Sequence, residues 1–84
     1  MNQMIKQLVN QKINNMTPDE LLKVSRQYGL SLSRSQGAKV SGLLKGREVD
    51  IFDDHERKAL LKTIAKNIDP GLAVSMNKLF NQFI

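Results

Sequence analysis

Apolar residues recur along this chain at intervals of three and four, the spacing that places side chains on one face of an α-helix. The first run covers the amino-terminal stretch and stops near Asn14. Its members are Ile5, Leu8, Val9 and Ile13. Two later runs contain Leu60, Leu61, Ile64, Ala65 and Ile68, and then Leu72, Ala73, Met76, Leu79, Phe80, Phe83 and Ile84. These patterns predict amphipathic helices at both ends of the chain.

Helix-start signals divide the chain into segments. The sequences TPDE at 17–20, SRSQ at 33–36 and DDHE at 53–56 have the spacing of a capping box. In this motif, two side chains three residues apart accept hydrogen bonds from each other's backbone amides. Asp69 followed by Pro70 predicts the start of the last helix.

Helix-stop signals complete the division. Gly29 is the expected left-handed terminator of the second helix, and Leu30 just beyond it can fold back on the last turn. The third helix, opened by Ser33, is expected to close at Gly46, and the fourth to run through Asn67.

Two short stretches, LSLS at 30–33 and VDIF at 49–52, alternate instead of following the helical period. Neither reaches the length of an ordinary strand, so we interpret them as extended connectors that bury two apolar side chains each. The alternative is a minimal pairing of the two stretches. The sequence therefore predicts an all-α fold, a compact bundle of about five short helices in a single domain, residues 1–84.

The third predicted helix contains Gly37 and Gly42, each of which costs about 1 kcal/mol relative to alanine. With Ala38 and Ser41 they form a ridge of small side chains, which allows a neighbouring helix to approach closely. A bound phosphate chain is the alternative neighbour. The buried face of this helix is expected to comprise Ala38, Val40, Leu43 and Leu44.

The segment 18–46 has some features of a helix-turn-helix DNA-binding motif. Ser25 is a small residue four positions before Gly29, as the motif requires. However, Ser35 stands where the recognition helix needs an apolar side chain, and the connector 30–33 is longer than the tight turn of the motif. We therefore expect a degenerate helix-turn-helix-like segment that does not read a DNA sequence.

Composition narrows the class of protein. The chain has 84 residues and no cysteine, which excludes disulfides, thiolate metal sites and a cysteine nucleophile. Its amino-terminal stretch has polar residues in nearly every turn, unlike a signal peptide, and no apolar run approaches the roughly 18 residues of a membrane span. We expect a cytoplasmic protein.

The charges are distributed unevenly. Six of the eight acids fall at predicted helix starts, where carboxylates stabilise unpaired amides. Residues 21–47 contain bases and no acid, and a second basic group follows along the fourth helix. An ordinary solvated helix face explains such spacing, and a polyanion-binding surface is the alternative. The candidate polyanion-binding residues are Lys23, Arg26, Arg34, Lys39, Lys45 and Arg47.

The apolar stripe of the last helix has to be covered. We expect it to pack against the first helix and close the domain, and the alternative is that it binds a second copy or a partner helix. Membrane adsorption is less favoured, because the first helix has only Lys6 and Lys12 as charged residues. The candidate apolar interface consists of Leu72, Met76, Leu79, Phe80 and Phe83.

Catalytic chemistry is hard to assemble from this sequence. His55 is the single histidine, and the acids around it match neither an EF-hand loop nor a helical zinc motif. Their position at a helix start explains them, so we predict no metal, no cofactor and no enzymatic activity.

Four stretches of sequence resemble a small family of uncharacterised proteins, a domain of unknown function from spore-forming Gram-positive bacteria. They are LVNQKINNMTPDELLK, QYGLSLS, DIF followed by ERKALLKTIAK, and NKLFNQF. The resemblance implies a compact helical domain without an assigned activity or ligand, so it transfers no functional residue to this chain.

The sequence thus predicts a small non-enzymatic binding module whose partner is another protein or a second copy. The alternative is nucleic-acid binding through the basic segment 18–46. The two differ in their response to salt, because binding to phosphates weakens steeply as salt is added.

Overall fold

The structure, a computed structural model, describes residues 3–84. These residues form five α-helices and the segments that connect them. The helices are α1 (Gln3–Asn14), α2 (Pro18–Gln27), α3 (Arg34–Arg47), α4 (Asp54–Asn67) and α5 (Pro70–Asn81). Within residues 3–84 there is no β-strand, and the stretches 30–33 and 49–52 are connectors that do not pair with each other. The all-α prediction is confirmed.

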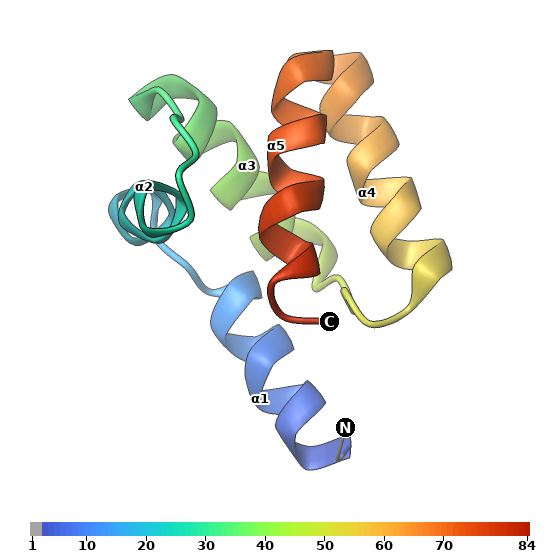
Figure 1. The fold of residues 1–84 in the computed structure, drawn as a ribbon. Coiled ribbons are helices and arrows are strands. Elements are labelled where there is room, and N and C mark those ends of the chain that lie inside the picture. The colour runs from blue at the N-terminus through green and yellow to red at the C-terminus, as the bar shows by residue number, and fades with distance from the viewer. Residues whose placement is uncertain (1–2) are drawn as a thin grey trace.

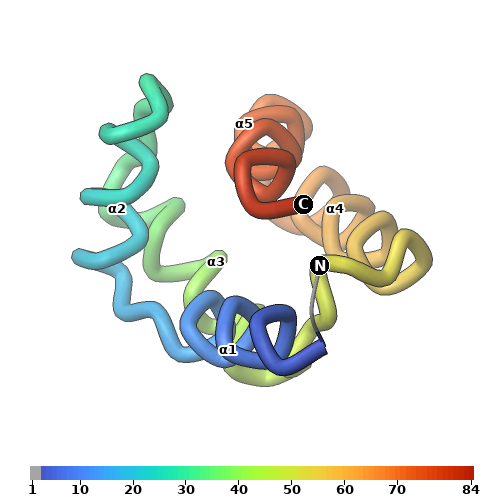
Figure 2. The backbone as a smooth tube through the Cα atoms, turned by 60° about the horizontal axis from the view of Figure 1, so that its bottom comes forward, coloured from blue at the N-terminus to red at the C-terminus, as the bar shows by residue number. Residues whose placement is uncertain are grey.

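Four of the helices form two packed pairs, and the fifth, α1, packs beside them. α2 packs against α3, and α5 packs along α4 (Figure 1). α1 contacts α3, and its first turns extend beyond the two pairs. Figure 2 shows α1 on the side of the molecule where the 48–53 connector passes from α3 to α4.

The core takes side chains from all five helices and from the 49–51 connector. Phe80 is the largest of the fully buried side chains, and the two connector residues Val49 and Ile51 are buried with it. Burying a large apolar side chain contributes roughly 1.5–3 kcal/mol. The connector therefore contributes to the stability of the core although it is not helical. The buried apolar residues are Ile13, Met16, Leu21, Val40, Leu44, Val49, Ile51, Leu60, Ile64, Leu72, Met76, Leu79 and Phe80.

Most of the expected helix boundaries have the predicted geometry. Thr17 accepts a hydrogen bond from the Glu20 amide at 3.2 Å, and Glu20 accepts one from the Thr17 amide at 3.1 Å. Ser33 and Gln36 close the same box at α3. Asp69 accepts from the Gly71 amide and begins α5. These bonds satisfy amides that would otherwise lack a partner at the helix starts.

The end of α2 is a complete Schellman motif. Gly29 has a φ of 76°, its amide donates to Arg26, and the Leu30 amide donates to the Ser25 carbonyl at 2.8 Å. A left-handed residue at this position suits glycine because it has no Cβ. The predicted role of Gly29 is confirmed.

Two predicted boundaries are corrected. α3 does not close at Gly46 but continues to Arg47, and Glu48 takes the left-handed conformation with a φ of 50°. The chain then turns so that Val49 and Ile51 enter the core. At α4, Asp53 caps the helix, but the expected box is not closed, because the Glu56 carboxylate accepts from the Asp50 amide at 3.3 Å.

The small residues of α3 serve internal packing at two positions. The buried stripe is Gly37, Val40, Ser41 and Leu44, whereas Ala38, expected in the core, is exposed. A Cβ at Gly37 would lie 3.4 Å from the Leu22 side chain, so α2 lies close against this point. Ser41 donates to the Met16 carbonyl at 2.7 Å and ties α3 to the segment that follows α1.

Two asparagines hold α1 against the 49–51 connector. Asn14 donates from Nδ2 to the Val49 carbonyl at 2.8 Å and accepts from the Val49 amide at 3.0 Å. One helical turn earlier, Asn10 accepts from the Ile51 amide at 3.0 Å and donates to the Asp50 carboxylate at 2.8 Å. The two side-chain amides bond the extended connector as a neighbouring strand would. We call this set of four bonds the asparagine clamp.

The clamp changes the expected place of α1. The apolar stripe of α5 was expected to pack against the first helix, but α5 lies along α4, and its stripe is covered there. Near the carboxyl end of the chain, Phe83 lines a groove with Leu8 and Val9 of α1. α1 packs on the connector through the side that carries Asn10 and Asn14. Their amides form hydrogen bonds with backbone groups of the connector that have no partner in a helix or strand.

We predict that Asn14→Ala lowers the free energy of unfolding by about 2–4 kcal/mol, because it leaves the buried amide and carbonyl of Val49 without partners. Asn15→Ala is the matched control. Asn15 is exposed just after α1, and its side chain donates to the Gln11 carbonyl, so we expect a loss of about 0.5 kcal/mol or less. Urea unfolding followed by circular dichroism measures both, and equal losses would contradict the clamp.

We predict opposite outcomes for two buried serines. Ser41→Ala removes the bond to Met16 and is expected to cost about 1–2 kcal/mol. Ser25 is fully buried, and its Oγ has no hydrogen-bond partner among the residues that the structure describes. Burying an unpaired hydroxyl is unfavourable, so Ser25→Ala is expected to leave stability unchanged or raise it by up to about 1 kcal/mol. A loss at Ser25 as large as that at Ser41 would show that this hydroxyl has a partner.

Candidate functional site

The outer side of α1 is an exposed apolar ridge. Met4, Ile5 and Leu8 are 69%, 49% and 60% exposed. Each residue advances about 100° around an α-helix, so Leu8 lies about 140° from the mean direction of Asn10 and Asn14. The clamp therefore fixes Leu8 away from the body of the protein. We call Met4, Ile5 and Leu8 the α1 ridge.

An apolar groove adjoins the ridge. It has a volume of about 210 Å³ and lies between α1 and the carboxyl end of the chain. Leu8 belongs to both the ridge and the groove. We call this the α1 groove, and its lining residues are Leu8, Val9, Lys12, Ile13, Met16 and Phe83.

Aromatic contacts extend this surface toward α2. The ring of Phe83 meets that of Tyr28 edge to face, with 6.1 Å between their centroids. Tyr28 and the neighbouring Ile84 are 44% and 46% exposed. Apolar surface thus continues from the α1 groove to the end of α2. This continuous area is larger than that of a single exposed apolar side chain.

The charges beside the groove are compensated. Lys12 Nζ lies 3.2 Å from a Glu20 carboxylate oxygen. The Thr17 backbone amide, and then the Lys12 ammonium, lower the pKa of Glu20 below its ordinary value of 4.5. Lys6 lies elsewhere on α1, 5.7 Å from the centre of the Phe52 ring, where its cation faces the aromatic surface. The charged residue that lines the groove, Lys12, is thus balanced by a carboxylate.

The structure places the candidate interface of α5 in the core. Leu72, Met76, Leu79 and Phe80 are at most 3% exposed, because α4 and the rest of the core cover them. They offer no surface to a partner in the folded chain. Phe83 alone of that set is only partly buried, and it lines the α1 groove.

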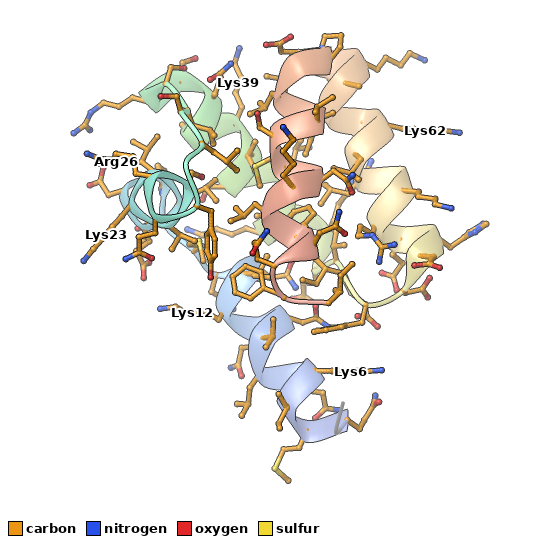
Figure 3. All side chains as sticks on the ribbon, viewed as in Figure 1. Lys6, Lys12, Lys23, Arg26, Lys39 and Lys62 are labelled. Atoms are coloured by element: carbon orange, nitrogen blue, oxygen red, sulfur yellow. The ribbon has the colours of Figure 1, made fainter. Side chains whose placement is uncertain are left out.

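The six candidate polyanion-binding residues do not gather on one face. Lys23 and Arg26 point outward from α2, and Lys39 lies at a different edge of the molecule (Figure 3). Arg34 is 3.5 Å from the Asp19 carboxylate, and Arg47 donates to Thr63 Oγ1 at 2.9 Å.

Lys45 is the sixth of these bases. It lies beside a polar hollow with Gln11, Asn15 and Glu48. The acid-free stretch 21–47 therefore folds into bases that point in different directions, several of which have polar or acidic neighbours.

The α2–α3 segment also differs from a helix-turn-helix motif. Ser35 and Lys39 are exposed on α3, and the buried side of this helix faces α2 and the Met16 carbonyl. The connector between the two helices, 28–33, is longer than the tight turn of the motif. The segment joins two packed helices and does not reproduce the motif's turn.

The acids around His55 act at the start of α4. Asp53 accepts from the amides of His55 and Glu56, and the guanidinium of Arg57 lowers the pKa of Asp54. Within residues 3–84, no three histidine or carboxylate side chains are arranged to hold a metal ion. None of the helices in this range is long and apolar enough to cross a bilayer.

A larger polar hollow of about 400 Å³ lies between α1 and the 48–53 connector. Asn10 and Asn14 line it, but both amides already bond the connector. The Lys6 ammonium faces Phe52 in the same place. The polar groups here serve the attachment of α1, so the ridge and groove are the stronger candidate for a binding site.

Sequence reasoning missed the ridge as a surface. Its signal was the width of the apolar pattern in α1, which contains Ile5 and Leu8 in addition to the buried Ile13. A second signal was the pair Asn10 and Asn14, which lie one turn apart on one face. Together they describe a helix with one polar docking side and a partly exposed apolar side.

Comparison with known proteins gives two matches. A family described as "Protein of unknown function (DUF2624)" matches residues 1–84. The "Uncharacterized protein YqfT" of Bacillus subtilis (strain 168) is 42% identical over 80 residues, which are 95% of each chain. No solved structure matches.

We predict that Glu20→Gln weakens the dependence of stability on pH. The lowered pKa of Glu20 stabilises the fold above the pKa of the unfolded chain, and this contribution is lost as pH falls through the folded-state pKa. Glutamine retains an oxygen for the Thr17 amide but does not titrate. Thermal unfolding from about pH 7 to pH 3 should show a smaller decrease in Tm for the variant. Identical decreases would contradict this role of Glu20.

Proposed function

Because the chain belongs to the family described as "Protein of unknown function (DUF2624)", its own surface is the guide to its function, and we propose a non-enzymatic module that binds another protein. The observation that supports this proposal is the exposure of Ile5 and Leu8 beside the α1 groove. A partner would bind by covering the ridge and inserting an apolar side chain into the groove.

The energy available from this surface is appreciable. Covering a large apolar side chain contributes roughly 1.5–3 kcal/mol, and Leu8 and Ile5 are each about half exposed or more. Binding surfaces between proteins commonly have an apolar centre and a polar rim. Here the compensated pair Lys12 and Glu20 lies at the groove, and Gln11 is an exposed polar residue of the same helix.

The shape favours a helical partner segment. A groove beside a helix accepts apolar side chains that recur every three or four residues on a partner helix. The inner end of the groove is closed by the buried Ile13 and Met16, which makes its base part of the rigid core. Such a surface binds without a large rearrangement, because the groove is already formed.

Nucleic-acid binding is the alternative proposal. The net charge of +5 supports it, since a positive field attracts any polyanion. The scatter of the six bases speaks against it, because a duplex or single strand requires cations along one continuous path. Stacking platforms are also poor, since Tyr28 and Phe83 contact each other at the edge of the apolar surface.

A tagged pull-down from the native lysate tests the proposal. The wild-type protein, Leu8→Gln and the double variant Lys23→Gln/Arg26→Gln would be compared with nuclease present and at about 0.5 M salt. We expect a protein band that survives both treatments and the double variant, but falls about tenfold or more with Leu8→Gln, because the ridge loses its central apolar contact.

Circular dichroism on all three proteins controls for folding. Capture that disappears with nuclease or with the double variant, but persists with Leu8→Gln, would contradict the proposal and support the nucleic-acid alternative. The absence of any specific band would also contradict it.

A further inference from the structure

We propose that the partner seated on the α1 ridge and groove is a second copy of this chain, in a two-fold symmetric dimer with antiparallel α1 helices. This inference rests on the proposed function and names its partner. Three observations support it: the ridge and groove lie side by side, the lysine that lines the groove is paired with a carboxylate, and the area of the surface is adequate for a weak dimer.

The surface is complementary to itself. Leu8 forms the inner edge of the ridge and the outer edge of the groove, so the two features share one face. In a two-fold interface the same patch is used by both partners, and each residue meets the symmetric patch of the other. Rotating one copy about an axis through Leu8 brings its ridge over the groove of the other.

The local charge at this face permits a second copy to bind despite the net charge of the chain. Two copies of a chain with a net charge of +5 repel each other, so they associate best where no free charge stands at the contact. The α1 surface meets this requirement, because Lys12 is compensated by Glu20 and Lys6 faces Phe52. An acidic helix would gain little attraction here, since the nearby ammonium already has a carboxylate partner.

The residues next to the ridge support the same choice. Gln7, Gln11 and Asn15 are exposed and uncharged, and α1 contains no acid. Amide side chains both donate and accept hydrogen bonds, so they can bond polar groups of the facing copy without adding a charge. Lysines at these positions would instead add to the net positive charge that repels a second copy.

The exposed apolar area is sufficient but small. The ridge, with Tyr28 and Ile84, exposes on the order of 500 Å² of side-chain surface per copy, near the upper size of patches on monomers. Two copies would bury about 1,000 Å², the lower limit of specific interfaces. We therefore expect a dimer with a Kd in the range of about 1–100 μM rather than a permanent one.

Sedimentation velocity over protein concentrations from about 5 μM to 500 μM tests the dimer, with the range chosen to bracket the expected Kd. The weight-average mass of the wild-type chain should rise from 9.5 kDa toward twice that value. Leu8→Gln, or Ile5→Gln as a second variant, should weaken dimerisation by about tenfold or more. Val74→Gln is the matched control, because Val74 is 58% exposed on α5, outside the groove lining.

Cysteine cross-linking tests the arrangement. The chain has no cysteine, so Leu8→Cys introduces a single thiol at the expected axis, and Val74→Cys places one on α5 as a control. Under mild oxidation we expect Leu8→Cys to form a disulfide-linked dimer at least about ten times faster than Val74→Cys, because its two thiols lie close together.

The outcomes separate this inference from the proposed function. A wild-type chain that stays at 9.5 kDa throughout, or a dimer that Leu8→Gln and Ile5→Gln leave unchanged, would overturn the inference. Equal cross-linking rates for the two cysteine variants would also overturn it. The proposed function is decided separately by the lysate experiment, in which any protein captured through Leu8, untagged copies of this chain included, supports it, and capture that does not depend on Leu8 contradicts it.

Discussion

The asparagine clamp between α1 and the 49–51 connector is the interaction on which the rest of the structure depends. An extended segment that enters a core carries backbone amides and carbonyls inward, and these need partners. In this fold the partners are not a neighbouring strand but the side-chain amides of Asn10 and Asn14. The same bonds set the rotation of α1 about its axis. With its asparagine side on the connector, the helix presents Leu8 to the solvent.

The charged groups divide into structural and solvated ones. Asp53 and Asp69 cap α4 and α5, and Glu20 completes the box at the start of α2. Other carboxylates meet arginines, as in the pairs of Asp19 with Arg34 and of Asp54 with Arg57. The acids are thus used to start helices and to hold local contacts, while the lysines cover the exterior. This distribution gives the protein a net positive charge, and several of its bases lie beside polar or acidic side chains, as Arg34, Lys45 and Arg47 do.

Local signals in the sequence were sufficient for most of the fold. Thr17, Ser33, Asp69 and Gly29 act through backbone groups within a few residues, so their effects were predictable without knowledge of the tertiary structure. The end of α3 was not predictable in this way. Glu48 takes the left-handed conformation there, and the chain turns so that Val49 and Ile51 are buried in the core, which depends on the tertiary structure.

Contacts between residues far apart in the sequence explain why the exposed ridge of α1 could not be predicted. The clamp joins residues 35–41 positions apart, and no local rule couples Asn14 to Val49. The apolar stripes of α1 and α5 look alike in the sequence, yet one is partly exposed and the other is core, because α5 has α4 beside it and α1 is attached by its polar side. The ridge of α1 was therefore recognisable only once the helices were placed.

Native-state hydrogen exchange on ¹⁵N-labelled protein tests the clamp most directly. Val49 and Ile51 lie outside any helix, so their amides should exchange rapidly unless something bonds them. The structure predicts that both amides are protected, with Val49 protected to a degree comparable with the core of α3. Exchange of the two amides at the rate of an exposed loop would contradict the account, since α1 would then be held in some other way and its outward face would not be fixed.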